Sequence, residues 1–243
     1  MKIAVIGAGA IGSLTAGYLK AKGEDVCLVG HAERVKAIKE NGLRISGVRG
    51  EFKVDISILE TLVSKPDLLI LATKTQDIEQ ALKSNLSLIK DTLILTTQNG
   101  VQSENIVAKF LPQKNILSGV IMFGATYLEP GKVVHNFEGD WVLGSIFDKA
   151  DNSNALSASA LLNKAFITVI SDDILGMKYL KIFVNANNCI PAILGISMQE
   201  AFLDLEVSRI SIAIWKEGME IMLGLGIKPV SLEGTERLVR QAI

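Results

Sequence analysis

Apolar residues in the first two-thirds of the chain form short runs that alternate with segments of helical spacing. Continuous runs such as Leu68–Leu71 and Leu93–Leu95 are typical of strands in a parallel sheet covered on both faces. The pattern predicts strands over residues 2–6, 25–29, 67–72, 92–97, 116–121, 140–145 and 165–170. It predicts helices over residues 10–22, 32–41, 76–84 and 103–110. This alternation indicates an α/β fold with a doubly wound parallel sheet.

The pattern changes near residue 174, after which only helical spacing remains. It predicts one helix over residues 174–194, one or two over 198–224 and another over 231–243. The polar stretch 148–157 is expected to join the last strands of the sheet. We therefore expect a nucleotide-binding domain over residues 1–170 and an all-helical domain over residues 171–243.

A glycine-rich loop joins the first strand to the first helix and has the G-x-G-x-x-G pattern. Gly7 permits the tight turn, Gly9 lets the backbone approach a pyrophosphate, and Gly12 lets the helix pack on the strand. The free N–H groups of the helix start face the anion. The strand before the loop and the helix after it favour a dinucleotide site in a Rossmann-type sheet. The candidate phosphate-binding residues are Gly7, Ala8, Gly9, Ala10, Ile11 and Gly12.

The end of the second strand bears on which dinucleotide binds. An acidic residue there holds the ribose 2′-hydroxyl of NAD, but this strand runs into Gly30, His31 and Ala32. Glu33 comes slightly later, and His31, Arg34 and Lys36 surround it. These cationic candidates for a 2′-phosphate favour NADP over NAD. The alternative is that Arg34 and Lys36 belong only to the solvated face of the next helix.

A polar stripe crosses the apolar helix expected over residues 174–194. It consists of Lys178, Lys181, Asn185 and Asn188, whose spacing puts them on one helix face. A lysine in an apolar cleft has a lowered pKa and can protonate the alkoxide that forms when a carbonyl is reduced. The alternative is a face that is simply solvated.

Composition, charge and residue spacing argue against several classes of function. The chain has 243 residues, of which 49% are hydrophobic and 21% charged, and its net charge is −1. No run of like charges indicates nucleic acid, and no apolar stretch reaches transmembrane length. The two cysteines and two histidines show no metal-ligand spacing. We expect a cytoplasmic protein without a metal.

The chain resembles the ketopantoate reductases, in which a Rossmann-type domain precedes a helical one. The resemblance covers essentially residues 1–230, and its motifs follow in the same order and at the same spacing. Beyond the glycine loop these motifs are Glu40–Leu43, Thr73-Lys74, Gln98–Val101 with Glu104, Gly124–Thr126, Glu129–Gly131, and Lys181 with Asn185.

The resemblance implies NADPH-dependent reduction of 2-dehydropantoate to pantoate, on the way to pantothenate and coenzyme A. It implies that the glycine loop and Lys74 bind NADP, and that Asn99 lies between cofactor and substrate. It implies that Lys181 is the general acid and that Asn185 binds the 2-keto acid.

The chain departs from the family pattern at several positions. His31 stands where many members have an arginine, Tyr179 where a tryptophan is common, and Cys189 where many have a second asparagine. The C-terminal helices that follow in the family, with a substrate-binding serine and glutamate, have no counterpart. These departures leave open a reductase of another 2-keto acid, or an NADP-binding homologue without turnover. An uncovered helical surface would also allow a homodimer.

Overall fold

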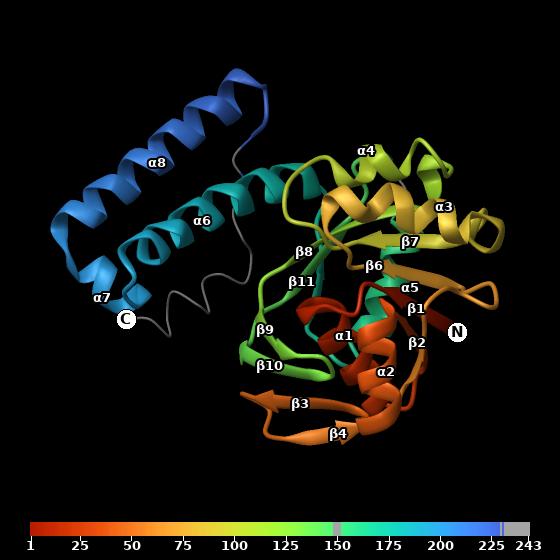
Figure 1. The fold of residues 1–243 in the computed structure, drawn as a ribbon. Helices are drawn as coiled ribbons and strands as arrows, with labels where there is room; N and C mark the ends of the chain where they lie inside the picture. The colour runs from red at the N-terminus through yellow and green to blue at the C-terminus, as the bar shows by residue number, and fades with distance from the viewer. Residues whose placement is uncertain (148–151, 229, 231–243) are drawn as a thin grey trace. The chain divides into compact units, whose positions relative to one another are not determined.

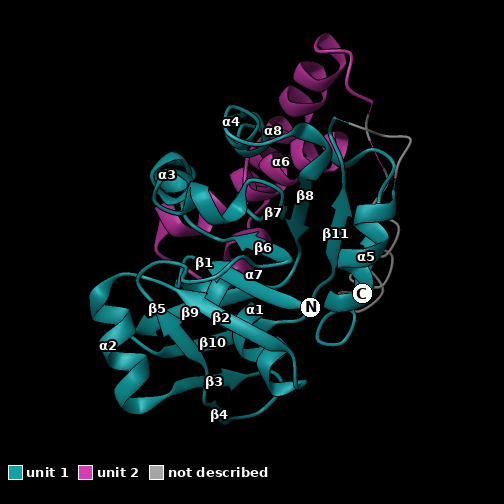
Figure 2. Cartoon of the chain, turned by 90° about the vertical axis from the view of Figure 1, so that its right-hand side faces the viewer, with its two compact units in different colours: residues 1–98, 102–174 teal, residues 99–101, 175–243 magenta. Residues whose placement is uncertain are grey.

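The computed structural model describes residues 1–147, 152–228 and 230. The chain divides into two compact units, which are coloured separately in Figure 2. The first unit comprises residues 1–98 and 102–174, and the second comprises residues 99–101 and 175–243.

The first unit is built on an eight-stranded sheet with the order β12-β11-β8-β7-β6-β1-β2-β5. Neighbouring strands are parallel except for β8 and β11, which are antiparallel. The α/β class and the Rossmann-type sheet are therefore confirmed, with one antiparallel step that the pattern did not predict. The strands are β1 (Lys2–Ile6), β2 (Asp25–Val29), β5 (Ser57–Leu59), β6 (Leu68–Leu71), β7 (Leu93–Thr96), β8 (Ile116–Ile121), β11 (Trp141–Gly144) and β12 (Thr168–Ile170).

Helices cover both faces of this sheet, which explains why its strands are apolar throughout. Alternate residues of a strand point to opposite faces. In β1, Ile3 and Val5 belong to one buried cluster, whereas Ala4 and Ile6 belong to another. Figure 1 shows α1 and α2 on one side of the sheet and α3 and α4 on the other. The helices of this unit are α1 (Ala10–Ala21), α2 (Ala32–Asn41), α3 (Ile78–Ile89), α4 (Ser103–Val107) and α5 (Ser153–Leu162), with short 3-10 turns η1 (Thr75–Asp77) and η2 (Gln113–Asn115).

A second, four-stranded sheet packs against α1, and the sequence pattern did not predict it. Its order is β4-β3-β10-β9, with β3 and β10 parallel and the outer pairs antiparallel. Leu43, Ile45 and Val133 of this sheet lie in the same buried cluster as Leu14 of α1. Its strands are β3 (Leu43–Gly47), β4 (Phe52–Val54), β9 (Gly124–Glu129) and β10 (Lys132–Phe137).

Three expectations about helices in this unit were wrong. Residues 153–157, expected to be part of a connection, begin α5, while residues 148–151 lie outside the described part of the chain. Helix α3 runs to Ile89, because Asn85 and Ile89 continue the buried stripe that Ile78 and Leu82 begin. Helix α4 ends at Val107, earlier than expected.

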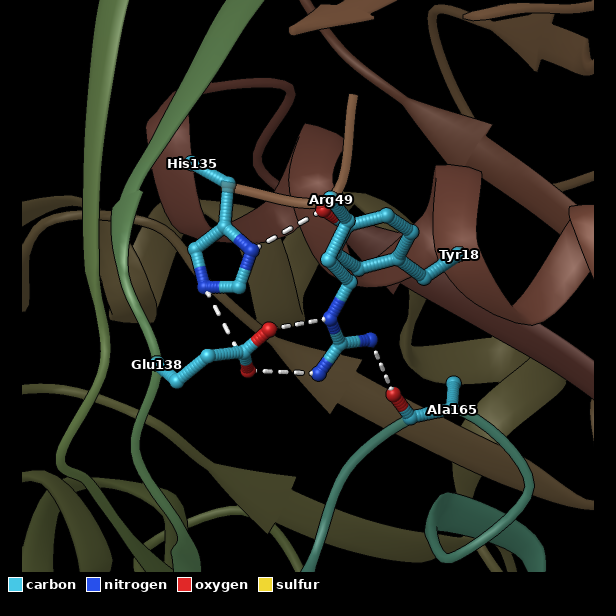
Figure 3. A network of polar contacts seen from close by, with 5 residues as sticks. All are labelled: Tyr18, Arg49, His135, Glu138 and Ala165. Carbon is cyan, nitrogen blue, oxygen red and sulfur yellow. Dashed lines mark hydrogen bonds and ion pairs between the residues drawn. The ribbon is translucent and has the colours of Figure 1, made fainter. Parts of the chain in front are cut away.

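A buried polar network fastens the small sheet to α1 (Figure 3). The Tyr18 hydroxyl and Nδ1 of the fully buried His135 are hydrogen-bonded at 2.9 Å. Arg49 donates two hydrogen bonds to the carboxylate of Glu138, at 2.6 and 2.7 Å, and a third to the carbonyl of Ala165 at 2.6 Å. The guanidinium also lies 4.6 Å from the centre of the Tyr18 ring. The network therefore joins α1, the turn after β3, the end of β10 and the segment after α5.

The second unit consists of α6 (Ile174–Leu194), α7 (Met198–Leu203) and α8 (Leu205–Gly224), of which α6 begins at the last residue of the first unit. The prediction of a helix over residues 174–194 is confirmed. The segment 198–224 forms two helices, because Asp204 is extended and its carboxylate accepts the N–H groups of Glu206 and Val207, which starts α8. The helix expected over residues 231–243 lies outside the described residues.

Helices α6 and α8 pack closely through a glycine and a buried amide. A Cβ on Gly218 of α8 would lie 2.5 Å from Cδ1 of Phe183 on α6. Asn187 donates to the carbonyl of Phe183 at 2.8 Å, and its Oδ1 accepts a 2.6 Å hydrogen bond from Ser211. The Gly218–Phe183 contact and the Ser211–Asn187 hydrogen bond both require a short distance between α6 and α8.

We expect Gly218→Ala to lower the free energy of unfolding by about 1–2 kcal/mol. The added methyl group overpacks the contact with Phe183, and this cost exceeds the gain in helix propensity. Gly224→Ala is the matched control, because a Cβ there meets nothing within 4 Å. This control should leave stability unchanged or raise it by up to about 1 kcal/mol. Urea unfolding followed by circular dichroism measures both, and a G218A protein as stable as wild type would contradict the close packing.

We expect the stability of the first unit to fall as the pH drops below the ordinary histidine value of 6.5. Burial lowers the pKa of His135, Glu138 opposes this shift and Arg49 adds to it. The unfolded chain therefore binds the proton more readily than the folded chain, and acid favours unfolding. Thermal unfolding between pH 5 and 8 should show a smaller slope in His135→Asn than in wild type. His31→Gln, at an exposed histidine, should keep the wild-type slope.

Candidate functional site

The glycine loop between β1 and α1 is closely packed at two of its three glycines. Gly7 has a φ of +113°, and a Cβ there would lie 2.5 Å from the backbone of Ala72, just after β6. A Cβ on Gly12 would lie 2.0 Å from the carbonyl oxygen of Gly7. The loop therefore holds this backbone path only with glycine at both positions.

Gly9, by contrast, has room for a Cβ. The nearest atom to a Cβ built there is Nη1 of Arg34, at 3.8 Å. Gly9 is the N-cap of α1, no side chain caps the helix, and its first turn has no acidic residue. The first N–H groups of a helix have no partner within it, and they attract anions. Ala10 and Ile11 begin the helix, and Ala8 is buried in the loop. These features fit a pyrophosphate.

The cationic candidates differ in how closely they approach this loop. Arg34 is half-buried on the first turn of α2, with its guanidinium beside Gly9. His31 is the exposed N-cap residue of α2. Lys74 is exposed at the N-cap of η1, after β6. The structure thus brings Arg34 to the loop and shows no such contact for His31 or Lys74.

Gln98 is a residue at the end of β7 whose role the sequence did not indicate. Its buried amide donates to the carbonyls of Leu71 at 2.8 Å and Thr73 at 3.0 Å, which holds the ends of β6 and β7 together. The sequence feature that could have indicated this role is the position of Gln98 at the start of the Gln98–Val101 motif, directly after a strand. The next residue, Asn99, is exposed and belongs to the second unit with Gly100 and Val101.

The polar stripe on α6 becomes more exposed toward the C-terminal end of the helix. Lys178 is only 2% exposed, Lys181 and Asn185 are partly buried, and Asn188 is exposed. Burial lowers the pKa of the Lys181 amine. A fully solvated stripe would not show this gradient, so the structure favours a stripe with partly desolvated lysines. All three predicted catalytic residues, Asn99, Lys181 and Asn185, lie in the second unit.

Other features of the described residues add no candidate. A cavity of about 240 Å³ lies between the end of α2 and the β9–β10 turn, and no predicted site residue lines it. Within the described chain, no group of three or more His, Cys, Asp or Glu residues is arranged to hold a metal. None of the helices searched is both long and apolar enough to cross a membrane.

A family model and a similar protein of known name indicate the same family for this chain. A family model described as ketopantoate reductase PanE/ApbA matches residues 3–147. The 2-dehydropantoate 2-reductase of Pyrococcus horikoshii is 34% identical over 231 residues, which cover 94% of this chain and 75% of that protein.

Solved structures share the fold. A D-mandelate dehydrogenase in a ternary structure with NADH and anilino(oxo)acetate is 31% identical, with a TM-score of 0.86 over 94% of this chain and 76% of that one. A PanE/ApbA family ketopantoate reductase from Ralstonia eutropha JMP134, at 24% identity, has a TM-score of 0.82 over 95% and 77% of the two chains and supports the fold alone. With its glycine loop, its partly buried polar stripe on α6 and relatives over nearly its whole length, this chain belongs to the ketopantoate reductase family of oxidoreductases.

Proposed function

We propose that the protein reduces 2-dehydropantoate to pantoate with NADPH, the product then serving pantothenate and coenzyme A synthesis. The observation that carries this proposal is Lys181, a partly buried lysine with a lowered pKa, one turn before Asn185 on α6. The 34% identical relative is named for this reaction. Cys27 and Cys189 are both free thiols, which suits a reducing compartment, and we propose the cytoplasm as the location.

The first unit would hold the cofactor. We assign the pyrophosphate to the glycine loop, because Gly9 is open and α1 begins there without a cap or an acid. Arg34 supplies positive charge beside the loop. The assignments of His31 and Lys74 to the ribose and its phosphate rest on the family resemblance and on their positions after β2 and β6. When bound, NADPH supplies the hydride.

The second unit would supply the proton. As the carbonyl carbon of the 2-keto acid gains a hydride, its oxygen becomes an alkoxide, and the Lys181 ammonium donates a proton to it and leaves a hydroxyl group. Desolvation makes this ammonium a stronger acid than an exposed lysine. Asn185 and Asn99 would orient the substrate through amide hydrogen bonds.

A second candidate is a reductase of a different 2-keto acid. The observation that favours it is the 31% identical neighbour, which is a D-mandelate dehydrogenase studied with NADH. The two candidates share the chemistry assigned to Lys181 and differ in substrate and cofactor. A panel of 2-dehydropantoate and phenylglyoxylate, each with NADPH and NADH, separates them.

We expect NADPH oxidation that depends on 2-dehydropantoate and that falls about 10²–10⁴-fold in Lys181→Ala, because the general acid is lost. The rate should fall as the pH rises through the lowered pKa of Lys181, since only the ammonium donates. Lys216→Ala, at an exposed lysine of α8 in the same unit, is the matched control and should keep the wild-type rate. Absence of turnover with every keto acid, despite cofactor binding, would indicate a binding protein and overturn the proposal.

We also propose that the second unit associates with a second copy of the chain. Leu205, Ile212 and Leu223 share one face of α8 and are 76%, 54% and 63% exposed. A stripe of large apolar side chains in water favours association. Light scattering should give twice the monomer mass, and Ile212→Asp should shift it to the monomer. Val63→Asp, at an exposed apolar residue of the first unit, should have no effect. A wild-type monomer would refute the proposal.

A further inference from the structure

Glu104 is a buried carboxylate that the proposed reaction does not use. It is only 1% exposed and lies on the first turn of α4, shortly after Asn99 in the chain. Its two carboxylate oxygens accept separate hydrogen bonds, one from the Thr96 hydroxyl at 2.5 Å and one from the Ser103 hydroxyl at 3.0 Å. A carboxylate in the protein interior is costly unless it is hydrogen-bonded, and these two hydroxyls offset part of that cost.

The hydrogen bond between Thr96 and Glu104 joins the end of β7 to the start of α4. Thr96 is the last residue of β7, and its side chain is completely buried. Its hydroxyl also lies within hydrogen-bonding distance, 3.1 Å, of the carbonyl oxygen of Leu117 on the neighbouring strand β8. Thr96 and Glu104 therefore fix the place where the chain enters α4 relative to two strands of the large sheet.

The other end of the loop between β7 and α4 is held by Gln98. Its buried amide donates to the carbonyls of Leu71 and Thr73, at the end of β6 and just after it. Residues 99–101 belong to the second unit, but Gln98 and Gln102 on either side of them belong to the first. Because each residue spans at most about 3.6 Å, so short a segment between two fixed ends has little conformational freedom.

Asn99 is the side chain that this loop presents. It is exposed, and the next residue, Gly100, has a φ of +96°, a backbone conformation that residues with a Cβ rarely adopt. Misplacement of a substrate-orienting group by about 1 Å lowers a reaction rate by about 10²-fold. A loop that is held at both ends gives Asn99 the precision that orienting a substrate requires.

We propose that Glu104 and Thr96 are positioning residues for the reduction, which hold the β7–α4 loop so that the amide of Asn99 meets the 2-keto acid in one orientation. The inference rests on the proposed function for the role of Asn99. Both side chains are buried, so they act through the loop and not by contact with the substrate.

Thr96→Val removes the hydroxyl and keeps the shape of the side chain. We expect kcat to fall about tenfold while the dissociation constant of NADPH stays unchanged, because the loss concerns the orientation of the substrate. Thr96→Ser keeps the hydroxyl and should retain most of the wild-type rate. Asn105→Gln, at an exposed residue of α4 next to Glu104, is the matched control and should keep the wild-type kcat.

A double variant with Asn99→Ala distinguishes positioning from a general structural effect. If Thr96 acts through the loop, adding Thr96→Val to Asn99→Ala should cause no further loss of kcat. Equal losses of kcat in the presence and absence of Asn99 would overturn the inference. A Thr96→Val protein with the wild-type kcat would overturn it as well.

Amide hydrogen exchange gives a readout that does not depend on turnover. The amides of residues 97–107 should exchange faster in Thr96→Val than in the wild type or in Thr96→Ser, because the free energy of local opening falls. Unchanged exchange in this segment would overturn the inference even if no keto acid were reduced. Exchange that follows the expected pattern, in a wild-type protein without turnover, would refute the proposed function and leave the restraint on the loop standing.

Discussion

The rest of the first unit depends on the contact of backbone with backbone at the glycine loop. Gly7 lies against Ala72 at the end of β6, and Gly12 lies against Gly7, at distances that leave no room for a Cβ. This contact brings the start of α1 to the ends of β1 and β6, where parallel strands place their ligands. Gly9, between these two close contacts, has room for a Cβ, with Nη1 of Arg34 as its nearest neighbour.

The small sheet contacts the two helices that follow β1 and β2, α1 and α2. Toward one end, Tyr18 and His135 hydrogen-bond, and Arg49 and Glu138 pair beside them, which fixes β10 to α1. Toward the other, the β9–β10 turn packs on α2 through Gly131. Helices α1 and α2 both begin beside the glycine loop. A sheet that looks like an addition to the Rossmann-type core therefore contacts both helices, α1 at Tyr18 and α2 at its C-terminal end.

How much the sequence could predict follows from how local each signal is. The strands of the large sheet are apolar on both faces, and the three glycines of the loop lie within six residues. The sequence pattern could therefore predict the large sheet and the glycine loop directly. The small sheet was missed because its strands are short and half exposed, as in β3, where Arg44 is exposed between buried Leu43 and Ile45. The dipeptide Pro130-Gly131 is a turn signal that lies between β9 and β10. Contacts such as that of Tyr18 with His135 join distant parts of the chain, and no periodicity reveals them.

Lys181 illustrates how stability and chemistry oppose each other in the second unit. Partial burial makes its charge costly, and an apolar residue in its place would avoid the desolvation that lowers its pKa. Asn187, on the same helix, is buried and fully hydrogen-bonded. Its amide nitrogen donates to the carbonyl of Phe183 and its amide oxygen accepts from Ser211, so it serves the packing of α6 on α8. The helix thus uses two kinds of polar residue. One kind is satisfied internally and holds the helices together, while the lysine gains acidity from the same apolar surroundings that make it unfavourable for the fold.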